Sequence, residues 1–227
     1  MISAELFTKD AHWCEWKLEL LLARRNGRAS FRASDRDGRT VFLKLFDDTE
    51  EERIEELFAR WTSLPELPAI VPCRRLVREQ GISALVLDWV DGPTVAAEIR
   101  GCPSASRRRE IVAAVAEGLA TIHRHGYVHG DVSSTNVLCA PGRIALTDLG
   151  LGVLDEAGTP PFASDLRGSA ADIYALGVLW LLLATGRRSS AKSDLYRLPP
   201  DEARLISGCL EGHYASAAEI CLGATTK

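Results

Sequence analysis

The sequence predicts an α+β protein with a β-rich first part and a mainly helical second part. Strand-like segments alternate with turn signals such as Asn26-Gly27 through the first 46 residues. In the second part, Ile173 to Ala184 is apolar on every side, as expected for a helix at the centre of a core. The composition changes near Asp91-Gly92-Pro93, so we expect one part over residues 1–90 and another over residues 91–227.

The first part is predicted to contain five strands and one helix. Its strand segments are rich in β-branched and aromatic residues and are separated by turn signals. We expect strands over Trp13–Ala23, Ala29–Ala33, Thr40–Phe46, Arg74–Arg78 and Ile82–Val90. Between the third and fourth strands, Asp47 to Thr62 has three glutamates near its start and an apolar stripe at helical spacing. This segment is therefore predicted to be a helix.

The second part is predicted to contain four helices and one hairpin. Apolar residues recur at helical spacing in the helices, and Gly126 is a stop signal after the first of them. The expected helices are Ser106–His125, Ile173–Ala184, Asp201–Cys209 and Ala215–Leu222. Two short strands, Asn136–Cys139 and Arg143–Thr147, flank a Pro141-Gly142 turn.

Composition narrows the class of protein. With 46% apolar and 26% charged residues, the 227-residue chain is typical of globular proteins. Its net charge of −4 gives no reason to expect nucleic acid or a membrane surface as the main partner. The longest apolar run is too short to span a bilayer, and no signal peptide is expected. The six cysteines form no C-x-x-C pair, which favours reduced thiols and a cytoplasmic location.

Lys44 is the first residue that points to chemistry. Strand alternation places it on the same face as Phe42 and Phe46, where an ammonium is costly to bury unless an anion meets it. The alternative is an edge strand whose lysine extends its amine to water.

Two polar loops beside the predicted hairpin carry further candidates. Asp131 and Asn136 lie five residues apart in His129-Gly-Asp-Val-Ser-Ser-Thr-Asn, and Asp148 follows the second strand. If the two strands pair, these three side chains converge. Oxygen donors of this kind suit Mg²⁺ better than zinc.

Together these segments resemble the signature motifs of the protein kinase superfamily. They read VFLK, HGDVSSTN and TDLG, in the family's order. The resemblance extends to Leu87–Gly92 as the hinge, Gly158–Phe162 as the substrate-docking segment, and Asp172–Trp180 as the central helix that anchors the catalytic loop. It implies a bilobal kinase fold, with residues 1–90 as the N-lobe and 91–227 as a shortened C-lobe.

The resemblance also implies roles for single residues. Asp131 would be the catalytic base, and Lys44 would contact the α- and β-phosphates of ATP. Asn136 and Asp148 would hold Mg²⁺. The adenine would meet backbone groups of Asp88 and Val90, with Leu87 as gatekeeper. Among the helix glutamates, we choose Glu55 as the partner of Lys44, with Glu51 and Glu56 as alternatives.

The chain departs from the family at several places. Where the family has a glycine-rich loop, Ala23–Ser30 has a single glycine. Arg24, Arg25 or Arg28 would supply charge to the phosphates instead, or the loop is a solvated basic turn. Gly130 replaces the arginine that receives an activating phosphate, and the segment after Asp148 is short, so no activation by phosphorylation of that segment is expected.

The resemblance leaves the type of kinase open. The docking and central-helix segments look like those of bacterial Ser/Thr protein kinases, and a protein substrate is expected. The catalytic loop, with Ser133 where these kinases carry lysine, is similar to RIO-type kinases and the small kinase of the KEOPS complex. A small-molecule, lipid or sugar kinase and a pseudokinase are the alternatives. A metal site in His123–His129 fits no zinc signature, and the oligomeric state is undetermined.

Overall fold

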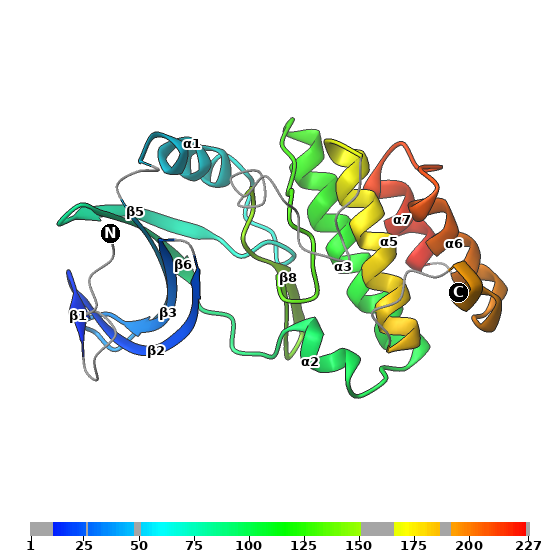
Figure 1. The fold of residues 1–227 in the computed structure, drawn as a ribbon, viewed down its shortest axis with the longest axis horizontal. Coiled ribbons are helices and arrows are strands. Elements are labelled where there is room, and N and C mark those ends of the chain that lie inside the picture. Colours follow the sequence, from blue (N-terminus) through cyan, green and yellow to red (C-terminus); the bar gives the residue numbers. More distant parts are fainter. Residues whose placement is uncertain (1–10, 26, 48–50, 151–165, 187–191, 226–227) are drawn as a thin grey trace. The chain divides into compact units, whose positions relative to one another are not determined.

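The computed structural model describes residues 11–25, 27–47, 51–150, 166–186 and 192–225. The chain divides into two compact units (Figure 1). The β-rich unit contains the chain up to Pro65 and then Val71–Val90. The helical unit contains Glu66–Ile70 and the chain from Asp91 onward. No helix in the described ranges is long and apolar enough to cross a membrane.

The described part of the β-rich unit is a six-stranded antiparallel sheet with one helix. Its strands are β1 (His12–Trp13), β2 (Trp16–Arg25), β3 (Arg28–Ser34), β4 (Thr40–Asp47), β5 (Cys73–Glu79) and β6 (Ile82–Asp88). They lie in the order β1-β2-β3-β4-β6-β5. Helix α1 (Glu51–Thr62) packs against β5 and β6 through buried Ile54, Leu57 and Trp61.

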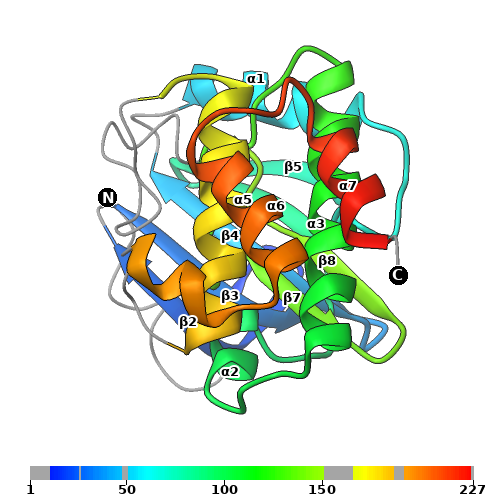
Figure 2. The ribbon, with the colours of Figure 1, turned by 90° about the vertical axis from the view of Figure 1, so that its right-hand side faces the viewer.

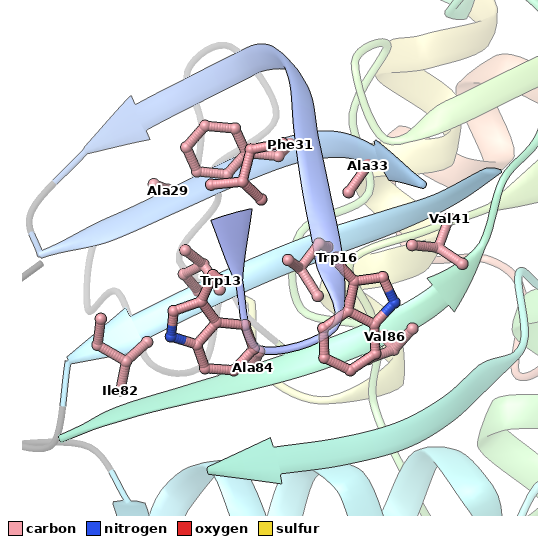
Figure 3. Close-up of a cluster of buried hydrophobic side chains, with 12 residues drawn as sticks. Trp13, Trp16, Ala29, Phe31, Ala33, Val41, Ile82, Ala84 and Val86 are labelled. Atoms are coloured by element: carbon pink, nitrogen blue, oxygen red, sulfur yellow. The ribbon is translucent and has the colours of Figure 1, made fainter. Parts of the chain in front are cut away.

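One face of this sheet carries the core of the unit, which we call the inner cluster (Figure 3). Its members are Trp13, Trp16, Leu18, Ala29, Phe31, Ala33, Val41, Leu43, Leu45, Ile82, Ala84 and Val86. Because side chains alternate along a strand, Phe42, Lys44 and Phe46 of β4 belong to the opposite face. Strand alternation thus places Lys44 on the face opposite the inner cluster.

The first strand differs from the prediction. A single strand from Trp13 to Ala23 was expected, but the chain turns at Cys14, whose φ is +53°. Trp13 and Trp16 therefore lie opposite each other on β1 and β2, with their rings stacked at 5.9 Å between centroids. Burial of both indole rings in the inner cluster offsets the strain of a left-handed non-glycine residue.

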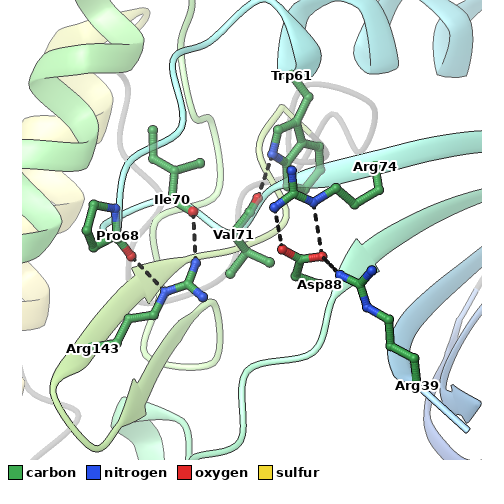
Figure 4. Close-up of polar contacts among 8 residues, drawn as sticks. All are labelled: Arg39, Trp61, Pro68, Ile70, Val71, Arg74, Asp88 and Arg143. Carbon is green, nitrogen blue, oxygen red and sulfur yellow. Dashed lines mark hydrogen bonds and ion pairs between the residues drawn. The ribbon is translucent and has the colours of Figure 1, made fainter.

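Hydrogen bonds to β8 explain why Glu66–Ile70 belongs to the helical unit (Figure 4). Arg143 donates from Nε to the carbonyl of Pro68 at 3.0 Å and from Nη2 to that of Ile70 at 3.2 Å. The amide of Leu146 donates to the carbonyl of Ala69 at 2.9 Å. Three successive bonds thus hold this short segment on the helical unit.

In its described residues, the helical unit contains the long helices α3 and α5 and one hairpin (Figure 2). Its helices are α2 (Val95–Ile99), α3 (Ala105–Arg124), α5 (Ser169–Thr185), the 3₁₀ helix η3 (Lys192–Arg197), α6 (Pro200–Leu210) and α7 (Ala217–Thr225). Helix α3 packs against α5 and α7, and α5 packs against α6. Strands β7 (Val137–Ala140) and β8 (Arg143–Leu146) form the hairpin.

A buried ion pair joins α3 to α6. Arg108 donates from Nε and Nη2 to the two oxygens of Glu202 at 2.8 and 2.6 Å, and Glu202 is 1% exposed. The indole of Trp180 on α5 donates to the same carboxylate at 2.8 Å. Burial alone would raise the pKa of Glu202, but these hydrogen bonds outweigh it and hold the pKa below its ordinary value.

The predicted α+β class, with a β-rich part followed by a helical part, is confirmed. Helix α5 begins four residues before the expected Ile173, and the short helices α2 and η3 were not predicted. The expected docking segment Gly158–Phe162 lies outside the described residues.

Candidate active site

The carboxylate of Asp172 fixes the loop that leads to Asp131. Asp172 lies in the first turn of α5 and is 2% exposed. Its Oδ2 accepts the amide of His129, and its Oδ1 accepts the amide of Gly130, both at 2.8 Å. Nε2 of His123 on α3 also donates to Oδ2, at 2.9 Å. The anchoring role that the resemblance implies for Asp172 is therefore confirmed.

His129 connects this loop to the end of β8. Its ring is fully buried, and Nε2 lies 2.9 Å from the carbonyl oxygen of Thr147. A carbonyl only accepts, so Nε2 carries the hydrogen. Nδ1 in turn accepts the amide of Asp131 at 3.2 Å. Both ring nitrogens are thus used for structure, which argues against a zinc ligand at this position.

The side chains of Asp131 and Asn136 are in direct contact. Nδ2 of Asn136 donates to Oδ2 of Asp131 at 2.8 Å and to its backbone carbonyl at 2.9 Å. The amide of Asn136 donates to the carbonyl of Ser133 at 3.1 Å, and Asn136 is 7% exposed. The loop between the two residues is therefore closed on itself, and the Asp131 carboxylate has a fixed orientation.

The β7–β8 hairpin brings Asp148 to this loop. Val137 pairs with Leu146, and the amide of Thr147 donates to the carbonyl of Asn136 at 3.0 Å. On the other side of Asp148, the amide of Gly150 donates to the carbonyl of His129 at 2.8 Å. Asp148 itself has a φ of +63°, a conformation that aspartate tolerates better than most residues. The predicted hairpin is confirmed, and Asp148 lies between two bonds to the loop.

The donor set of this loop fits a hard divalent cation. Because Asn136 uses its Nδ2 on Asp131, its Oδ1 is the atom that remains to serve as a ligand, and it accepts a long hydrogen bond from the Thr135 hydroxyl at 3.5 Å. Carboxylate oxygens of Asp148 would complete the protein ligands, and Mg²⁺ prefers such oxygens. The described residues include no group of three His, Cys, Asp or Glu side chains arranged for a metal.

In the β-rich unit, Lys44 occupies the middle of β4. It pairs with Ser30 on β3 and Leu85 on β6, so it stands at the centre of the sheet rather than at an edge. The edge-strand alternative is therefore wrong. Phe46, two residues further along the same face of β4, is fully buried, and Lys44 is half-buried.

Glu55 lies on the face of α1 towards β5. Its carboxylate forms an ion pair with Arg78, and Glu51 pairs with the same arginine at 3.1 Å. The Glu55 side chain is 56% exposed. Its pairing with Lys44 stays a prediction.

The expected hinge follows directly from β6. Leu87 is fully buried and Val90 is 5% exposed. The carboxylate of Asp88 lies between Arg74, at 2.6 Å, and Arg39, at 3.2 Å (Figure 4). Its amide donates to the carbonyl of Pro72 at 3.1 Å. Its side chain and its amide are thus both engaged within the sheet.

Sequence reasoning did not find Arg39 and Arg74. They come from a turn and from a different strand, 49 and 14 residues away from Asp88. Only the strand order β4-β6-β5 brings the three side chains together, and no local pattern encodes it.

Comparison with known proteins agrees with this geometry. The family model described as protein kinase domain matches residues 31–197, so the chain belongs to that family. The serine/threonine-protein kinase PkaA of Streptomyces coelicolor is 33% identical over 142 residues, covering 53% of this chain and 26% of that protein. An inactive leucine-rich repeat receptor-like serine/threonine-protein kinase of Arabidopsis thaliana is 28% identical over 188 residues, covering 71% of this chain and 29% of that protein.

A solved structure shows the same fold. The kinase domain of Mycobacterium tuberculosis PknI superposes with a TM-score of 0.75 at 20% identity, covering 96% of this chain and 98% of that one. The fold is thus a bilobal, kinase-like α+β fold. The chain spans between a quarter and a third of the length of the two curated relatives above.

Proposed function

We propose that the protein is an ATP- and Mg²⁺-dependent phosphotransferase that acts on serine or threonine residues of proteins. The contact between Asn136 and Asp131 carries the proposal. An aspartate oriented by a neighbouring amide, on a loop clamped by Asp172, suits a group that must accept a proton from an attacking hydroxyl. The match to the protein kinase domain family supports it.

In this proposal, Asp131 is the catalytic base. Its carboxylate orients the substrate hydroxyl and takes its proton as the phosphoryl group transfers. Nδ2 of Asn136 and the amide contact with His129 keep Asp131 in place. Positioning of this kind accounts for much of the rate in phosphoryl transfer.

The remaining site residues bind the nucleotide and the metal. Lys44 pairs with the phosphates, and Glu55 is the proposed carboxylate partner of Lys44. Backbone groups of Asp88 and Val90 contact adenine, beside the gatekeeper Leu87. Asn136 and Asp148 hold Mg²⁺, which when bound neutralises charge on the phosphates.

We further propose that phosphorylation of the activation segment does not regulate the enzyme. Gly130 stands where the family's phosphate-binding arginine would be, and it donates its amide to Asp172. The six free cysteines support a reducing, cytoplasmic location. We propose residues 1–90 as the N-lobe and residues 91–227 as the C-lobe; Glu66–Ile70 of the first range is part of the helical unit.

A nucleotide-binding pseudokinase is the second candidate. The turn after β2 contains only Gly27 where the family has three glycines, and one relative is named as inactive. A small-molecule kinase is the third, because Ser133 occupies the position of the family's lysine.

Transfer from γ-labelled ATP with Mg²⁺ tests the proposal. The acceptors are the protein itself and a generic basic protein, and the enzymes are wild type, Lys44→Met and the exposed control Lys17→Met. Label on protein from wild type and the control, but not from Lys44→Met, is expected. ATP consumption only with small hydroxyl compounds would identify a small-molecule kinase. ATP binding without any transfer would identify a pseudokinase.

A further inference from the structure

Three arginines flank the turn between β2 and β3: Arg24 and Arg25 end β2, and Arg28 begins β3. Arg24 pairs with Ala29, and Ala29 is a member of the inner cluster. Directly opposite residues in an antiparallel pair share a face. Arg24 is therefore assigned to the face opposite Lys44. The side chain of Arg25 lies outside the described part of the chain.

Arg28 lies on the face of Lys44. It pairs with Phe46 on β4, and its guanidinium carbon is 5.8 Å from the centre of the Phe46 ring. Phe46 is two residues from Lys44, so both belong to one face of β4. Arg28 and Lys44 are thus diagonal neighbours across β3 and β4, a relation that places Cβ atoms roughly 7–8 Å apart.

The residue between them is small. Ser30 pairs directly with Lys44 and is two residues from Arg28 on the same face. It is 6% exposed and carries no bulky group. On the face opposite the inner cluster, the cationic side chains of Arg28 and Lys44 thus flank the short side chain of Ser30. This geometry suits an anion with several oxygens.

The single glycine of the turn is explained without a ligand. Gly27 has a φ of +73°, and a Cβ there would lie 2.5 Å from a carboxylate oxygen of Asp47. The positive φ of Gly27 in this hairpin turn itself favours glycine. Nothing about Gly27 indicates that its backbone is kept open for close approach to a phosphate.

We propose that Arg28, together with Lys44, binds the phosphates of the nucleotide and takes over the task that a glycine-rich loop performs with backbone amides. The inference rests on the proposed nucleotide site. A guanidinium offers paired N–H donors that match two phosphate oxygens, whereas Lys44 offers a point charge. The Phe46 ring beneath the guanidinium restricts it to the face of Lys44.

Equilibrium binding of ATP and of adenosine tests this inference. The proteins are wild type, Arg28→Ala, Arg28→Gln, Arg28→Lys and the control Arg36→Ala, an exposed arginine in the turn between β3 and β4. We expect Arg28→Ala and Arg28→Gln to weaken ATP about tenfold while adenosine changes less than about twofold. The ATP affinity of Arg28→Lys should lie between those of wild type and Arg28→Ala. Arg36→Ala should bind ATP as tightly as wild type does.

The outcomes separate the inference from the proposed function. Unchanged ATP affinity in both Arg28→Ala and Arg28→Gln, or an equal loss for adenosine, overturns the role of Arg28 while the nucleotide site stands. Wild type that binds neither ligand overturns the proposed function, and the inference with it. Unfolding temperatures of the unliganded variants show that a loss of ATP binding is not a loss of fold.

Discussion

The backbone amide of Gly130 donates a 2.8 Å hydrogen bond to Oδ1 of Asp172, although 42 residues separate them. Gly130, the residue directly before Asp131, has a φ of +77°. In this conformation its amide donates to Asp172 in the first turn of α5. The family's arginine at this position is thus replaced by the residue for which this backbone conformation costs least. Anchoring of the loop therefore depends on Asp172 of α5.

Removal of the Asp172 carboxylate is expected to destabilise the helical unit strongly. Asp172→Ala leaves three buried or half-buried donors, from His123, His129 and Gly130, without their acceptor. We expect a loss of about 3 kcal/mol or more in the free energy of unfolding. Urea unfolding followed by circular dichroism checks it. Asp201→Ala, at a 75% exposed carboxylate, is the control, and equal effects of both variants would contradict the anchoring role.

Gly130→Ala is expected to cost about 1 kcal/mol because a Cβ is strained at positive φ. Gly101→Ala is the matched control. Gly101 does not have a positive φ, and its new Cβ would meet only the Glu98 carbonyl, at 3.4 Å. The same urea measurement applies. A Gly130→Ala protein as stable as wild type would show that the loop adopts another conformation.

Glu202→Gln is expected to lower stability by about 3 kcal/mol because it leaves the Arg108 guanidinium buried without a counter-charge. The folded pKa of Glu202 lies below its unfolded value. Its contribution is therefore complete above the ordinary value of 4.5 and is lost as pH falls through the lowered pKa. The free energy of unfolding, measured at a series of pH values, should fall less on acidification in the double variant Arg108→Met, Glu202→Leu than in wild type. Identical acid sensitivity would disprove a contribution from this pair.

Alkylation should distinguish the cysteines. Burial raises the pKa of Cys73, Cys139 and Cys209 to about 12, so their thiolates are scarce at pH 8. Cys102 is exposed. Iodoacetamide followed by peptide mass spectrometry should label Cys102 first, and the three buried thiols only after unfolding. Rapid labelling of Cys209 in the native protein would contradict the packing of α6 against α5.

Local patterns predicted most elements, and non-local contacts account for the failures. The β7–β8 hairpin followed from two short apolar runs around Pro141-Gly142, and α3 followed from its apolar spacing and Gly126. The turn at Cys14 has no glycine or asparagine to signal it, because tertiary burial of Trp13 and Trp16 stabilises it. Asp131, Asn136 and Asp148 could be grouped because a hairpin joins them, whereas the arginines around Asp88 come from separate strands.

The most direct test of the account compares phosphate transfer and ATP affinity in Asp131→Asn and wild type. The amide has nearly the shape of the carboxylate but cannot accept the proton, so transfer should fall at least about 100-fold. ATP affinity should stay within about threefold, because nucleotide binding is assigned to other residues. Asp201→Asn, at an exposed carboxylate on α6, should behave as wild type in both measurements. Transfer by Asp131→Asn at the wild-type rate would contradict the assignment of Asp131 as the catalytic base.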